Sequence, residues 1–342
     1  MLYKLLRPAV FTLDAERAHK LTIEALKLSP RSGPPRAGKL SVQVAGLHFP
    51  NPLGMAAGFD KDGEVPDAVL GLGFGFTEIG SLTPRPQAGN PKPRLFRLRQ
   101  DRGVINRMGF NNGGLPAALP QLEKRRTRPG IVGINIGANK DSADRIADYA
   151  TMAEAVAPFA SYLAINVSSP NTPGLRALQD PIALGALIDR VKDSAGKDAP
   201  PIFLKVAPDL QPADIDDLAR LAIAKELGAL IVSNTTIERP PLQSRHAGEA
   251  GGLSGAPLGG MALQRVRDFH TATGGAVPLV GVGGIASAED AWDRIRAGAS
   301  LVQLYSAMVY EGPGLAAKIV KRLERLMRRD GFSSIAEAVG TE

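Results

Sequence analysis

Five asparagines are the most informative polar residues of this chain, because they stand at or near the ends of short apolar runs with almost no acidic residues among them. They are Asn106, Asn135, Asn166, Asn171 and Asn234. A carboxamide holds N–H donors and a C=O acceptor in one plane. Several that converge suit a flat ring with alternating N–H and C=O groups, and Lys61 can pair with a carboxylate on that ring.

Eight short apolar runs alternate with segments of helical periodicity, and this alternation predicts the fold. The runs cover residues 53–55, 76–80, 131–136, 162–166, 202–206, 230–234, 279–281 and 301–304. Between two of them, residues 213–227 have helical apolar spacing, with Pro212 before and Gly228 after, and Ser287 resembles the start of a capping box. Eight such units predict an α/β fold, a (β/α)8 TIM barrel, whose functional groups lie at the carboxyl ends of the strands.

The chain before the first barrel strand is predicted to form an appendage. Residues 13–28 have helical periodicity with apolar residues on more than one side, 29–35 read as a proline-rich linker, and 42–49 as a hairpin closing the bottom of the barrel. We therefore divide the chain into N-terminal helices, residues 1–38, and a barrel domain, residues 39–342.

Two glycine-rich segments late in the chain, 251–255 and 281–286, indicate a phosphate site. The second fits the loose G-x-G-x-x-A dinucleotide pattern, but it follows the seventh run instead of the first, and Leu301 stands where an acidic residue is needed. Barrels commonly bind one phosphate on backbone N–H groups after the last two strands; tight turns without a ligand are the alternative. One phosphate pocket together with Lys205 suggests FMN, because a cation near the flavin stabilises the reduced anionic ring.

The composition argues against several classes of site and partner. The chain has no cysteine, which rules out disulfides, iron–sulfur clusters and a cysteine base. Its four histidines show no ligand spacing, so we expect no metal. The net charge of +7 suits anionic small molecules or an acidic membrane, but the cations are dispersed and aromatic residues make up only 5%, so no nucleic-acid partner is expected.

The first 28 residues combine apolar side chains with the cations Lys4, Arg7, Arg17 and Lys20, and no run approaches the ~20 apolar residues of a membrane span. A basic segment with apolar residues on several sides can lie in the membrane interface. A helix pair that only covers the barrel fits the same residues equally well.

Five motifs resemble, in order, those of the class 2 dihydroorotate dehydrogenases. They are 51–61 (NPLGMAAGFDK), 78–87 (EIGSLTPRPQ), 105–112 (INRMGFNN), 166–176 (NVSSPNTPGLR) and 251–255 (GGLSG). With Tyr305 and Ser306 the resemblance extends from residue 51 to residue 306. It implies that (S)-dihydroorotate is oxidised to orotate through FMN in pyrimidine (UMP) biosynthesis, and that a membrane quinone reoxidises the FMN.

By this resemblance the site residues fall into three groups. The cofactor group is Ala57, Gly58, Phe59, Asp60, Lys61, Ser81, Asn135, Asn166, Lys205, Ser233, Gly255, Gly284, Tyr305 and Ser306. The substrate group is Lys61, Asn106, Arg107, Met108, Gly109, Phe110, Asn166, Asn171, Asn234 and Thr235. The quinone group is His19 and Arg97.

The same resemblance implies that Ser169 is the base that takes a proton from carbon 5 of the substrate, where the soluble class uses cysteine. A serine hydroxyl is a poor base, and no histidine or carboxylate stands beside it in sequence, so neighbours or water must relay the proton. Without the resemblance, a hydroxyl that only stabilises a Ser-Pro turn is the simpler interpretation.

The expected partners are dihydroorotate and orotate, a membrane quinone, and the membrane surface contacted by the N-terminal helices. We expect a monomer, peripheral on the cytoplasmic face of the cell membrane. Two alternatives stay open: a Schiff-base lyase or aldolase barrel that uses Lys205, and a non-catalytic peripheral membrane protein. Neither explains the asparagines.

Overall fold

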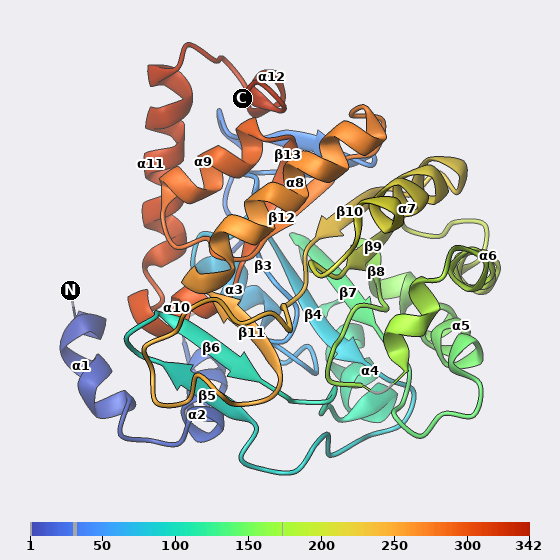
Figure 1. Ribbon diagram of the computed structural model, residues 1–342, viewed down its shortest axis with the longest axis horizontal. Helices are drawn as coiled ribbons and strands as arrows, with labels where there is room; N and C mark the ends of the chain where they lie inside the picture. The colour runs from blue at the N-terminus through green and yellow to red at the C-terminus, as the bar shows by residue number, and fades with distance from the viewer. Residues whose placement is uncertain (1, 30–32, 173) are drawn as a thin grey trace.

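The computed structural model describes residues 2–29, 33–172 and 174–342. Residues 30–32 of the predicted linker and Pro173 of the fourth motif lie outside the described residues. Figure 1 shows a barrel surrounded by helices, with the N-terminal helices and a small separate sheet at one end.

Eight parallel strands close into the barrel, in the order β10-β12-β13-β3-β4-β7-β8-β9. Their bounds are β3 Leu53–Met55, β4 Phe76–Leu82, β7 Ile131–Ile136, β8 Tyr162–Asn166, β9 Ile202–Val206, β10 Ala229–Val232, β12 Leu279–Val282 and β13 Ala299–Leu304. All eight predicted strands are confirmed, and with them the (β/α)8 fold. β10 ends at Val232, two residues before its predicted limit, although the Ser233 and Asn234 N–H groups still donate to Val282 O at 3.1 Å and to Val206 O at 2.9 Å.

The helices surround the barrel. They are α3 Pro66–Gly71, α4 Gly114–Arg125, α5 Arg145–Val156, α6 Pro181–Ala195, α7 Pro212–Ala224, α8 Gly259–Thr273, α9 Ala288–Arg296, α10 Ser306–Glu311, α11 Leu315–Arg329 and α12 Ile335–Ala338. The predicted helix at 213–227 ends at Ala224, and Glu226 then takes a positive φ of 47°. Ser287 Oγ accepts the Asp290 N–H at 3.0 Å and Asp290 Oδ2 accepts the Ser287 N–H at 2.9 Å, which confirms the predicted capping box.

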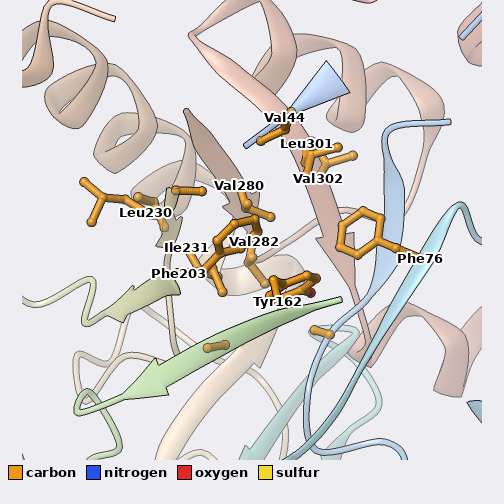
Figure 2. Packing of buried hydrophobic residues seen from close by; sticks show 14 of the residues in the cluster. Val44, Phe76, Tyr162, Phe203, Leu230, Ile231, Val280, Val282, Leu301 and Val302 are labelled. Carbon is orange, nitrogen blue, oxygen red and sulfur yellow. The ribbon is translucent and has the colours of Figure 1, made fainter. Parts of the chain in front are cut away.

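Aromatic rings fill much of the barrel interior. Tyr162 on β8 stacks on Phe203 of β9 with ring centres 4.2 Å apart, and Figure 2 shows both beside aliphatic side chains of β10, β12 and β13. Glycines on neighbouring strands leave room for such rings: a Cβ on Gly133 would collide with Tyr162, and a Cβ on Gly54 with Phe76. The interior is therefore a packed core and not a pore.

The two ends of the barrel are covered differently. The predicted hairpin is confirmed as β1 (Val42–Val44) and β2 (Leu47–Phe49), and its buried residues join the core of the barrel. The carboxyl end carries an antiparallel sheet that the sequence analysis did not predict, in the order β11-β6-β5. Its strands are β5 Leu95–Leu98, β6 Gly103–Asn106 and β11 Gly252–Gly255.

The N-terminal helices lie at this same end, against β5 and α10 (Figure 1). α1 covers Leu2–Val10, and α2 covers Ala15–Lys27, where the sequence predicted 13–28. α2 begins at Ala15 because the Asp14 side chain accepts the Arg17 N–H at 2.9 Å and caps it. Among the helices formed by the described residues, none combines the length and the apolar character that a bilayer crossing needs.

Candidate active site

One cavity of about 640 Å³ opens at the carboxyl end of the barrel strands and continues between the barrel and α2. Most predicted site residues line it. They are Ala57, Gly58, Phe59, Lys61, Ser81, Asn106, Met108, Gly109, Phe110, Asn166, Ser169, Asn171, Lys205, Ser233, Asn234, Thr235, Gly255, Gly284, Tyr305 and Ser306, together with His19 and Arg97. The structure thus brings residues from all three predicted groups around one space.

Three predicted site residues do not line this cavity. The Asp60 carboxylate accepts two backbone N–H groups of the loop that follows it, at 2.8 Å each. The Arg107 guanidinium turns away from the cavity and pairs with Glu249 at 2.8 Å. Asn135 is fully buried and accepts a hydrogen bond from Ser81, so it stands behind the lining residue. These three side chains support the wall of the cavity, and other residues are left to contact a ligand.

Asn166 is the centre of a hydrogen-bonded amide network. Its Nδ2 donates to Ser81 Oγ at 2.9 Å and to Asn135 Oδ1 at 3.2 Å. Its Oδ1 accepts from Asn234 Nδ2 at 3.3 Å, and the same amide donates to Ser168 Oγ at 3.0 Å. Side chains from four strand ends are therefore held in fixed mutual orientation, as a template for donors and acceptors on a ligand.

A buried carboxylate lies beneath this network. Glu78 on β4 is fully buried, and it accepts hydrogen bonds from Asn135 Nδ2 at 2.8 Å, Gln303 Nε2 at 2.9 Å and the Tyr162 hydroxyl at 3.0 Å. Burial lowers the pKa of Lys205, and the negative charge of Glu78 opposes that effect. Within the described part of the chain, Lys205 Nζ makes no hydrogen bond, so its charge remains available to a ligand.

The glycine-rich segments form a concave backbone surface. Gly255 and Gly284 have positive φ angles of 85° and 72°, and a Cβ on Gly284 would come within 2.7 Å of Gly259 N. The buried Arg294 holds the surface together from behind, because its Nη2 donates to Gly283 O at 2.6 Å and to Gly259 O at 3.0 Å. Bare backbone between two such turns suits a phosphate.

Ser169 lies in the loop after β8 and is nearly buried. Its Oγ accepts the Asn171 N–H at 3.3 Å, and Asn171 Nδ2 donates to Asn106 Oδ1 at 3.3 Å. Arg176 fixes the start of the loop by donating from Nε to Ser168 O at 3.1 Å. Among the described residues, no histidine or carboxylate hydrogen-bonds to the Ser169 hydroxyl.

Lys61 is a second cation at the polar end of the cavity. It donates a hydrogen bond to Asn111, and burial, aided by the nearby charge of Arg94, lowers its pKa to about 8. The adjoining loop is held by Gln87, whose Nε2 donates to the Phe110 carbonyl at 3.0 Å. An ammonium group that is buried beside amides suits an anionic ligand, because a nearby carboxylate favours its charged form.

The end of the cavity beside α2 is largely apolar. His19 meets the Phe59 ring edge to face at 5.5 Å, and its Nδ1 lies 3.4 Å from the Tyr305 hydroxyl. Burial, with a contribution from the charge of Lys61, lowers the pKa of His19 to about 4, so the imidazole is neutral at physiological pH. Arg97 donates to backbone carbonyls in and after α1, Val10 at 3.3 Å and Leu13.

Sequence reasoning missed the residues that support the site from behind. Glu78 carried one signal, an isolated acid in a predicted strand that is otherwise apolar. Arg294 and Arg94 carried none, because surface helices and loops are normally rich in arginine. Their roles depend on burial, which only the fold reveals.

A closed parallel barrel with a polar, amide-lined cavity at its carboxyl end defines a (β/α)8-barrel protein with a site for a small polar ligand. The family model described as dihydroorotate dehydrogenase matches residues 39–327. Dihydroorotate dehydrogenase (quinone) of Erythrobacter litoralis is 67% identical over 100% of both chains, and that of Novosphingobium aromaticivorans is 66% identical over 99% of both. The crystal structure of the Eimeria tenella enzyme in complex with ferulenol superimposes with a TM-score of 0.92 at 40% identity, covering 96% of this chain and 95% of that one. This chain belongs to the dihydroorotate dehydrogenase family, in its quinone-dependent class 2.

Proposed function

We propose that the protein oxidises (S)-dihydroorotate to orotate, with FMN as bound cofactor and a membrane quinone as final acceptor, in de novo pyrimidine biosynthesis. One observation carries the proposal: a single cavity joins an amide-rich polar end, at the barrel strands, to an apolar end beside α2. A charged substrate and an apolar acceptor need these different surroundings, and the relatives named above are quinone enzymes of dihydroorotate.

The residues present fit FMN. Gly255 and Gly284 leave a surface that a Cβ would fill and a phosphate can occupy, and Lys205 offers a buried cation that makes no hydrogen bond among the described residues. The cofactor group predicted from sequence is proposed to hold it, with Asp60 and Asn135 acting from behind. Bound in this way, FMN would supply an acceptor for the hydride of the substrate and a donor of electrons to the quinone.

The substrate is proposed to lie on the asparagines. Lys61 pairs with its carboxylate, and Asn106, Asn166, Asn171 and Asn234 satisfy the ring N–H and C=O groups. Thr235 and the loop 106–110 complete the enclosure. Arg107 contributes only its backbone, because its side chain is held by Glu249.

Ser169 is proposed to accept the proton from carbon 5 while the hydride leaves carbon 6. The Asn171 N–H fixes the direction of the serine oxygen, and a near-buried position excludes bulk water. General-base catalysis typically raises a reaction rate by 10²–10⁴-fold. Ser169→Ala is therefore expected to slow the reduction of FMN by dihydroorotate by about that factor. Ser169→Cys supplies the base of the soluble class and is expected to recover part of the rate.

The N-terminal helices, residues 1–38, are proposed to form the acceptor and membrane module of a monomer, and residues 39–342 the catalytic barrel. His19, neutral in its surroundings, and Arg97 are proposed to meet the quinone head group. Four leucines of this module are strongly exposed to solvent: Leu5, Leu6, Leu21 and Leu28. Apolar side chains on this end suit insertion into the interface of the cell membrane, on its cytoplasmic face.

An absorbance spectrum of the purified protein, followed by anaerobic addition of dihydroorotate, tests the proposal. We expect a yellow protein that bleaches with dihydroorotate and recovers its colour with a soluble quinone. A yellow protein unchanged by dihydroorotate would contradict the substrate. A colourless protein that borohydride inactivates in the presence of substrate would favour a Schiff base on Lys205. Membrane binding by a protein without any chromophore would favour the non-catalytic peripheral membrane protein.

A further inference from the structure

A buried ion pair fastens α2 to the segment that precedes β5. Arg94 Nη2 donates to Glu16 Oε1 at 2.7 Å, and Arg94 Nε donates to Glu16 Oε2 at 3.0 Å, so the pair is bidentate. Arg94 is 6% exposed and Glu16 5%. The hydrogen bonds from Arg94 lower the pKa of Glu16, which keeps the carboxylate charged. A planar fork of this kind fixes orientation as well as distance.

The other edge of the Arg94 guanidinium organises a loop. Its Nη1 donates to Ala88 O at 2.6 Å and to Asn90 O at 2.8 Å. Asn90 is also held through its side chain, because Lys140 Nζ donates to its Oδ1 at 3.0 Å. A single arginine therefore links α2 to the segment 88–94.

That segment touches both loops proposed to hold the substrate. Asn90 Nδ2 donates to Asn171 O at 3.1 Å, in the loop of Ser169. On the other side, the Asn90 N–H donates to Met108 O at 3.0 Å, and the Arg107 N–H donates to Arg94 O at 2.9 Å. Every step from α2 to either loop is thus a direct hydrogen bond or ion pair.

The groups on this path are closely packed at two glycines. A Cβ on Gly109 would lie 2.8 Å from Asn90 Cγ, and a Cβ on Gly89 would lie 2.9 Å from Arg94 Nη1 and closer still to Met108 O. Close contacts transmit a displacement better than loose ones do. We therefore expect a shift of Arg94 to reach the two loops through these contacts and hydrogen bonds.

We infer that Glu16 and Arg94 are positioning residues that couple the docking of α2 to the geometry of the substrate loops 106–110 and 168–172. Buried ion pairs contribute little net stability and are best used to specify one arrangement. With α2 docked, both loops are held in the arrangement that binds substrate. When α2 moves away, Arg94 loses its ion pair with the Glu16 carboxylate and the loops become more mobile. Coupling between sites is reciprocal, so a bound substrate also holds α2 in place. The inference rests on the proposed function for the identity of that substrate.

The test is hydrogen–deuterium exchange on the intact, cofactor-loaded protein, with orotate as probe. Two variants are compared. Glu16→Gln removes the negative charge of the pair, and Arg94→Lys removes the bidentate guanidinium, each with little change in side-chain volume. Lys27→Gln is the matched control, because Lys27 also ties α2 to the barrel, through Glu64 at 2.6 Å, but lies outside this path.

We expect Glu16→Gln and Arg94→Lys each to speed exchange in both loops and to weaken orotate binding about tenfold or more, while Lys27→Gln changes binding less than twofold. Orotate is expected to protect α2 from exchange in the parent protein and to lose that effect in both variants. Unchanged loop exchange in Glu16→Gln, with α2 itself loosened, would overturn the inference. Absence of orotate binding by the parent protein would contradict the proposed function alone, because loop exchange without ligand still tests the coupling.

Discussion

Replacing Gly284 by alanine perturbs the proposed phosphate surface by one methyl group. Gly284 has a φ of 72°, where an alanine costs about 1–2 kcal/mol relative to an ordinary backbone conformation. Its Cβ would lie 2.7 Å from Gly259 N, whereas non-bonded heavy atoms rest about 3.5–4 Å apart. The Gly259 Cα would lie closer still, and both atoms belong to the backbone, so the turn after β12 must move by at least about 1 Å relative to the start of α8.

A movement of this size breaks a hydrogen bond to a phosphate oxygen, since donor and acceptor atoms must lie within about 3.2 Å. A hydrogen bond to a charged group contributes about 1.5–3 kcal/mol. Loss of one such bond therefore predicts binding of FMN about 10- to 150-fold weaker, at about 1.4 kcal/mol for each factor of ten.

The assay is titration of the apoprotein with FMN, followed by the quenching of flavin fluorescence. Gly331→Ala is the matched control, because Gly331 has a φ of 83° and a Cβ there meets nothing within 4 Å. The control is expected to lose about 1–2 kcal/mol of stability and no affinity for FMN. Equal FMN affinity in the two variants would refute the phosphate surface at Gly284.

Three further predictions concern charge and exposure. Because the pKa of Lys61 is lowered to about 8, we expect the affinity for orotate to be full below that pH and to fall as the pH rises through it. Lys61→Ala is expected to remove this pH dependence. A pH-independent affinity in the parent protein would contradict the pairing of Lys61 with the orotate carboxylate. Glu78→Gln removes the negative charge that favours the charged form of the buried Lys205, and we expect it to cost about 3 kcal/mol of stability in urea denaturation. Tyr162→Phe removes the hydroxyl's hydrogen bond to Glu78 and a longer one from Gln303 at 3.4 Å, and we expect it to cost about 1–2 kcal/mol. Equal losses would show that the charge of Glu78 is unimportant. The double variant Leu5→Ser, Leu6→Ser is expected to weaken binding to anionic vesicles, measured by sedimentation, about 100-fold, from about 3 kcal/mol of lost apolar burial. Ile182→Ser on α6 is the control, because Ile182 is 85% exposed against 78% for Leu5 and 51% for Leu6, and we expect it to leave vesicle binding unchanged. Equal effects would argue against a specific membrane face.

The strands and the polar strand ends could be predicted from sequence because both are local signals. A buried parallel strand needs a short apolar run, and the chain must change to polar residues or glycine where the run meets the cavity. Asn166 and Lys205 were identified in this way. The sheet of β5, β6 and β11 could not be, because Gly252 pairs with Asn106 at a separation that no local pattern specifies.

The side chains that stand behind the site were beyond prediction for a different reason. Asp60 and Arg107 lie in motifs that mark the site, and Asn135 lies near the end of a predicted strand, but neither a motif nor a strand end states which way a side chain points. Arg107 turns to Glu249, a residue 142 positions further along the chain. The motif therefore predicted that the loop lies at the site, but it could not show that Arg107 faces the site with its backbone and not with its side chain.

The cavity takes its two ends from parts of the chain that can change separately. At the apolar end, α2 contributes Leu21, Thr22, Ala25 and Leu26 to the wall of the cavity, while strand ends of the barrel form the polar end. Substitutions along one face of a 13-residue helix can therefore reshape the apolar end and leave the amide network intact. If that end receives the electron acceptor, as proposed, a new acceptor preference can arise within α2 while Glu16 keeps its ion pair with Arg94.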